Sequence, residues 1–175
     1  DNLDVRAAGL VAQGNARFAN EGPTVDLTFN GPIDAIAAPM KGRVAGTATL
    51  RPSTSGEPVL ATNLRITSGR IGALAFSRLD ASASGALDNI SIRGNLRGNA
   101  SGAPVNLELA GTVQRAGDAT NIRAETSGNI NGTTVSTREP FTLSLSPNVT
   151  RGAGTFALGD GILRATLNDE KSRLT

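Results

Sequence analysis

Residues 87–111 read LDNISIRGNLRGNASGAPVNLELAG, and two runs within them alternate strictly between apolar and polar side chains. One run is Ile90-Ser91-Ile92-Arg93, and the other is Val105-Asn106-Leu107-Glu108-Leu109. Successive side chains of a β-strand point to opposite faces, so each run places its apolar residues on one face. Glycines and a proline separate the runs, which predicts a hairpin-like unit with one apolar side and one polar side.

The composition of the chain favours many short strands over packed helices. Its 175 residues suffice for one domain with a core of its own. They include 21 glycines and 8 prolines, but only 5 aromatic residues, all of them phenylalanine. This mixture is typical of all-β proteins with frequent turns and a thin aliphatic core.

Charges of both signs are scattered along the chain, with a net charge of +2 from 17 basic and 15 acidic residues. Such mixing is typical of a solvated surface, and the aromatic side chains on which nucleic-acid bases stack are scarce. We therefore expect no nucleic-acid partner. Nearly all basic residues are arginines, whose guanidinium groups can grip phosphate, so contact with lipid headgroups stays open beside the simpler interpretation of exposed charge.

The side chains that perform most enzyme chemistry are missing from the sequence. It has no histidine, cysteine or tyrosine, which removes the common general bases, several nucleophiles and the usual metal ligands. Asp169 and Glu170 are adjacent in a charged tail, where strand geometry points neighbouring side chains apart. We therefore expect no enzyme activity, no catalytic residues, no metal site and no cofactor.

An internal repeat links the two halves of the chain. Residues 22–31 read GPTVDLTFNG and residues 102–111 read GAPVNLELAG, with valine and two large apolar residues at alternate positions in both. Repeat-like units are therefore expected near 14–31 and 94–111, within a single β-repeat segment that spans 1–175. The chain begins without a signal peptide, and we interpret it as a segment of a longer protein.

Local signals predict where strands end. Gly14 with Asn15, residues 69–72 and residues 159–161 predict turns, and the composition of 51–58 predicts a loop. Residues 35–38 are consistent with a single helical turn. Strands of about eight residues would make a sheet roughly 25 Å wide.

Short strands with one apolar face must bury or cover that face. The repeat favours an elongated, curled antiparallel sheet or a β-solenoid, and a β-sandwich is a further alternative.

The run from Ile66 to Leu87, ITSGRIGALAFSRLDASASGAL, resembles repeats of the TamB proteins of bacterial envelopes, and so does the run from Arg93 to Gly111. TamB proteins belong to the wider AsmA-like group of lipid-transfer proteins. The likeness covers about residues 31–167 and consists of a rhythm of glycine, small residues and alternating aliphatic residues.

This resemblance implies a location and a role. A TamB-like protein is periplasmic and is anchored in the inner membrane of a Gram-negative bacterium, and the absence of cysteine is compatible with that oxidising compartment. Its elongated, curled antiparallel sheet would be a β-taco, or repeating β-groove, with one apolar concave face. This face would shield or conduct phospholipid acyl chains, or hydrophobic segments of outer-membrane proteins. It would thereby support outer-membrane biogenesis and protein secretion together with a TamA-like outer-membrane barrel, reached through the full-length protein.

The hydrophobic groove expected from this resemblance consists of alternating apolar residues. They are Val25, Leu27, Phe29, Leu64, Ile66, Ile90, Ile92, Val105, Leu107, Leu109, Phe141, Leu143, Leu145, Phe156 and Leu158. The simpler interpretation is that these residues form a closed, dry core. The alternative function is a passenger or stalk segment of a surface adhesin or autotransporter, which would bind through exposed loops such as 51–58.

Overall fold

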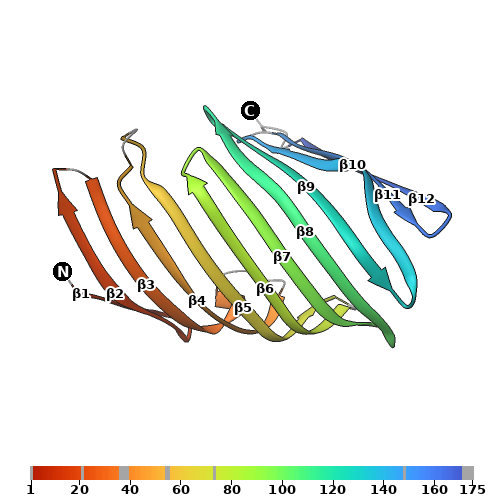
Figure 1. Cartoon of the computed structure of the whole chain (residues 1–175), viewed down its shortest axis with the longest axis horizontal. Coiled ribbons are helices and arrows are strands. Elements are labelled where there is room, and N and C mark those ends of the chain that lie inside the picture. Colours follow the sequence, from red (N-terminus) through yellow and green to blue (C-terminus); the bar gives the residue numbers. More distant parts are fainter. Residues whose placement is uncertain are drawn as a thin grey trace.

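The computed structural model describes residues 2–20, 22–35, 40–53, 56–72, 74–147 and 149–170. Twelve strands form one antiparallel sheet in which every strand pairs with its neighbours in the sequence (Figure 1). The strands are β1 (Asn2–Ala7), β2 (Leu10–Ala19), β3 (Gly22–Pro32), β4 (Met40–Arg51), β5 (Val59–Ile71), β6 (Leu74–Ala86), β7 (Asn89–Ala100), β8 (Ala103–Ala116), β9 (Ala119–Ile130), β10 (Thr133–Leu145), β11 (Val149–Leu158) and β12 (Gly161–Glu170).

The predicted elongated, curled antiparallel sheet is confirmed. The sheet does not close on itself, and β1 and β12 form its two edges. In the part of the chain that the structure describes, no second sheet lies against it, which rules out the alternative sandwich there. Such a meander needs only local hairpin connections, because each strand pairs with the one that directly follows it.

Most strands are longer than the expected eight residues. They run to 14 residues in β8, and strands of 12 or 13 residues span about 40 Å. The turn predicted at Gly14 and Asn15 is wrong, because both residues lie inside β2. Gly14 stays in the ladder between Leu3 and Leu27, whose strands provide its backbone partners.

The turns themselves use residues with positive φ. Ala8 and Gly9 connect β1 to β2 at φ values of 50° and 84°, a turn that the sequence did not reveal. The turn predicted at 159–161 is confirmed, with Gly159 at φ 57°. The turn predicted at 69–72 begins later, at Gly72, because Gly69 remains in β5 opposite Phe76. A register shift between β4 and β5 near Gly69 leaves this pairing with β6 intact.

The predicted repeat units are both hairpins. Residues 14–31 contain the β2–β3 pair and residues 94–111 contain the β7–β8 pair. In each hairpin a glycine of the first strand faces a leucine of the second, Gly14 opposite Leu27 and Gly94 opposite Leu109.

One short helical segment covers part of the sheet. The 3₁₀ helix η1 (Ile33–Ala35) follows β3 and lies over the lower ends of β4–β6 in Figure 1. The helical turn predicted over 35–38 coincides with it only at Ala35, and residues 36–38 lie outside the described residues. Ile33 packs with Val44, Ile66 and Phe76 to form the main buried cluster of the sheet.

Candidate functional site

All fifteen residues of the expected groove lie on one face of the sheet, which we call the apolar face. The strand register establishes this, because directly opposed residues share a face. Ile66 lies opposite Leu79, which lies opposite Leu96, and Leu96 in turn lies opposite Leu107. The remaining groove residues belong to rows that run parallel to this one. The register places the fifteen residues on one face together with unpredicted residues such as Val44 and Leu79, and their role as a lipid groove stays a prediction.

Two rows of large side chains run across the strands of the apolar face, and each row forms a ridge. The first ridge contains Val44, Ile66, Leu79, Leu96 and Leu107. The second ridge contains Leu50, Leu60, Ile90, Val113, Ile122 and Leu143, with Gly85 interrupting it between Leu60 and Ile90. Val44 and Leu50 stand six positions apart on β4, so the ridges are about 20 Å apart along the strands.

Between the ridges lies a track of smaller side chains. One row of the track contains Ala48, Thr62, Ala83, Ile92, Gly111 and Ala124. The other row contains Gly46, Leu64, Ala81, Gly94, Leu109 and Thr126. Seven of these twelve residues are glycine or alanine, so the track has mostly smaller side chains than its borders, with Leu64, Ile92 and Leu109 as exceptions. It crosses six strands, β4 to β9, and is therefore about 24 Å long.

The apolar face is incompletely buried. Of the fifteen groove residues, Ile66 and Val105 are buried, while Leu109, Leu145 and Leu158 are exposed by 41%, 37% and 47%. The other ten are half-buried. Only η1 lies over this face among the described residues, so the side chains that remain accessible are available to a ligand.

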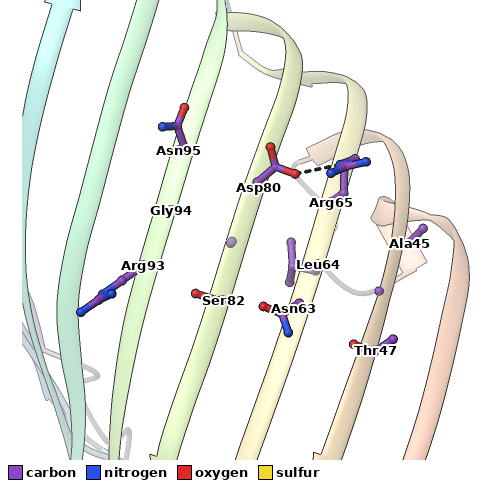
Figure 2. A pocket seen from close by; sticks show the side chains of 12 residues that line it. Ala45, Thr47, Asn63, Leu64, Arg65, Asp80, Ser82, Arg93, Gly94 and Asn95 are labelled. Carbon is purple, nitrogen blue, oxygen red and sulfur yellow. Dashed lines mark hydrogen bonds and ion pairs between the residues drawn. The ribbon is translucent and has the colours of Figure 1, made fainter.

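The opposite face, which we call the polar face, presents serine, threonine, asparagine and charged side chains. A hollow of about 550 Å³ on this face extends over β4–β7 and is lined by Asn63, Arg65, Asp80, Arg93 and other residues (Figure 2). Leu64 of the predicted groove also borders it, lying between Asn63 and Arg65 on β5. Neighbouring hollows along the sheet are lined mainly by side chains of the same face.

Ion pairs lower the pKa values of three exposed carboxyl groups. The hydrogen bond from Arg78, followed by that from Arg65, lowers the pKa of Asp80. The Lys41 ammonium, 2.9 Å from Asp34, lowers the pKa of that carboxyl group in the same way. All three acids, including Asp4 beside Arg6, are therefore ionised at neutral pH.

The arginine cluster around Asp80 was not identified from the sequence. Arg65, Arg78 and Arg97 are scattered along 33 positions, and only the register of β5–β7 brings them to Asp80, with Arg93 further along the same face. An alternating pattern shows that such residues face away from the core, but it does not show which strands are neighbours.

The described residues contain no group of three or more acidic side chains that could hold a metal ion. Among the same residues, no helix has the length and hydropathy needed to cross a bilayer. No protein-family model matches the chain, and neither does any curated protein or solved structure.

Proposed function

We propose that the apolar face shields or conducts the acyl chains of phospholipid, as one segment of a TamB-like envelope protein that supports outer-membrane biogenesis and protein secretion. The observation that carries the proposal is the long apolar face without a covering layer among the described residues. Apolar patches larger than a few hundred Å² are uncommon on monomeric proteins and mark sites of interaction.

The accessible surface of the chain supports an unfilled face. It amounts to 11280 Å², whereas a compact monomer of 17.8 kDa exposes about 8,000 Å². A closed, dry core would require a second layer to bury the side chains that are still exposed, such as Leu109.

The track between the ridges suits an acyl chain in shape. A hydrocarbon chain laid across the strands contacts the small residues below it and the aliphatic ridge beside it. Its binding requires only removal of apolar area from water, which stabilises a complex by about 25 cal/mol per Å². The absence of histidine, cysteine and tyrosine from the sequence is compatible with such binding, because no chemical step is needed.

The cellular context of the proposal depends on the resemblance of residues 66–87 and 93–111 to TamB repeats. On that basis we place the chain in the periplasm, within a protein anchored in the inner membrane. Phospholipid acyl chains, or hydrophobic segments of outer-membrane proteins, are its ligands, and a TamA-like barrel is the partner of the full-length protein.

The first test is a titration of the purified chain with a fluorescent fatty-acid analogue, combined with native mass spectrometry of co-purified lipid. We compare Leu109→Asp on the track with Asn106→Asp, which places the same charge on the polar face of the same strand. Leu109→Asp is expected to weaken probe binding about ten-fold or more, because the carboxylate must lose its hydration against an acyl chain. Asn106→Asp is expected to bind like the wild type.

Circular dichroism of both variants separates ligand loss from unfolding. Leu109 is 41% exposed, so its replacement leaves a solvated charge in the free protein and should preserve the fold. A lipid-free chain that takes up no acyl probe would contradict the proposal, as would equal binding by Leu109→Asp and the wild type.

A further inference from the structure

The polar face carries an excess of positive charge over β5, β6 and β7. Arg78 on β6 lies directly opposite Arg97 on β7, and the two side chains share the polar face. Like charges at directly opposed positions destabilise a sheet, because their β-carbons are only about 5 Å apart. An anion placed between the two guanidinium groups would relieve their repulsion, which Asp80 relieves only on the Arg78 side.

The acids of this region neutralise only part of that charge. Asp80 accepts a hydrogen bond from Arg65 Nε at 2.7 Å and another from Arg78 Nε. In the stretch 74–147, as in the rest of the described chain, no ion pair joins Arg93 or Arg97 to an acid. The guanidinium groups of Arg65, Arg78 and Arg97 with the single carboxylate of Asp80 leave a net charge of +2 beside Asp80.

The unneutralised arginines border connected hollows. A hollow of about 230 Å³ is lined by Arg78, Asp80, Asn95 and Arg97. It shares Asp80 and Asn95 with the hollow of about 550 Å³, which Arg65 and Arg93 also line (Figure 2). Glu108 and Glu125 line the next hollow along the sheet, which Arg93 and Asn95 also line, so the acids of that hollow lie on the Arg93 side and not beside Arg97.

We propose that this arginine cluster is a binding site for a phosphate group. Guanidinium groups form two parallel hydrogen bonds to an oxyanion, and these charge-assisted bonds are about twice as strong as neutral ones. A phosphate has enough oxygen atoms to accept hydrogen bonds from Arg97 on one side and from Arg78 on the other, whereas a carboxylate has only two oxygen atoms. The amide of Asn95 supplies a further donor at the same rim.

The site is independent of the proposed acyl-chain surface, because it lies on the opposite face of the sheet. Two ligands carry a phosphate group that this site could bind, namely free phosphate in solution and the headgroup of a phospholipid. The two are distinguished by experiment below.

The first experiment titrates inorganic phosphate into the purified chain at constant ionic strength and follows backbone amide shifts by nuclear magnetic resonance. Arg97→Gln removes one guanidinium group of the site and is expected to weaken phosphate binding about ten-fold. Arg123→Gln on the polar face of β9 is the control, because it removes the same charge away from both hollows and should change binding less than about two-fold.

A second variant tests the opposite change in the affinity for phosphate. Asp80→Asn removes the one carboxylate that lines the smaller hollow and also releases Arg65 and Arg78 from their ion pairs. It is expected to strengthen phosphate binding about ten-fold, a change that loss of structure would not produce.

Flotation with phosphatidylglycerol vesicles, with and without competing inorganic phosphate, identifies the source. Vesicle binding that Arg97→Gln abolishes would assign the site to a headgroup, and binding of inorganic phosphate alone would assign it to a soluble ligand. Equal losses in Arg97→Gln and Arg123→Gln, or no binding of either probe, would overturn the proposal. None of these results depends on uptake of an acyl probe.

Discussion

At Gly98 the backbone of β7 lies so close to β6 that a side chain would not fit. A β-carbon added there would stand 2.5 Å from the carbonyl oxygen of Ala75 and 2.6 Å from the Cα atom of Phe76. Both neighbours are backbone atoms, so no rotamer change relieves the contact. Gly94, four positions earlier on the same strand, has its nearest neighbour at 3.6 Å, an ordinary contact.

We therefore expect Gly98→Ala to lower the free energy of unfolding by about 1–3 kcal/mol, the usual cost of overpacking. Gly94→Ala is the matched control and should lie within about 0.5 kcal/mol of the wild type. Urea unfolding followed by circular dichroism measures both values. Equal stabilities of the two variants would show that the approach of β6 and β7 at Gly98 is looser than described.

At the scale of the element, η1 contributes a buried side chain from outside the strands to the main cluster of the sheet. Ile33 is 5% exposed and packs in the cluster of Val44, Ile66 and Phe76. This corner is the most enclosed part of the apolar face, since its three strand residues are 2–4% exposed. Elsewhere the strands depend on their hairpin partners alone.

The contribution of η1 is measurable by truncating its buried side chain. Ile33→Ala is expected to cost about 2–4 kcal/mol of unfolding free energy, from lost burial and the cavity that remains. Ile162→Ala makes the same change in the edge strand β12, where the side chain is 56% exposed, and should cost less than about 1 kcal/mol. Thermal and urea unfolding of the two variants provide the comparison, and a cost for Ile33→Ala as small as that for Ile162→Ala would contradict the packing of η1.

At the scale of the whole molecule, the open sheet exposes more surface than a compact fold. The chain exposes 11280 Å² when folded and about 26,000 Å² when unfolded. Its unfolding therefore uncovers about one fifth less area than the unfolding of a compact protein of the same mass. The dependence of the unfolding free energy on urea scales with that area.

We expect the urea m-value of the monomer to be about one fifth below that of a compact protein of 175 residues. Sedimentation velocity at the same protein concentration establishes that the species measured is a monomer. A full-sized m-value in a monomer would indicate that the apolar face closes on itself in solution. A concentration-dependent m-value would indicate that two copies cover each other's apolar faces.

Local alternation determined much of this protein. A period of two places Val105, Leu107 and Leu109 on one face whatever their neighbours are, because pleating depends only on the strand itself. The same pattern placed the fifteen predicted groove residues on one face, but it did not single out Val44, Leu79 and Leu96, which share that face. It was less successful at strand ends, as at Gly14, since a glycine ends a strand only where neighbouring strands do not continue the ladder.

Only the tertiary structure decided which residues face one another across strands. The sequence contains the aliphatic residues of the ridges, but their alignment into two rows with a track between them depends on register across β4–β9. The arginine cluster around Asp80 has the same origin, because Arg65 and Asp80 are 15 positions apart and meet only through the β5–β6 pairing. The absence of a covering layer over most of the described apolar face is likewise a tertiary property. Alternation requires that an apolar face exist, whereas long-range packing decides whether it is covered.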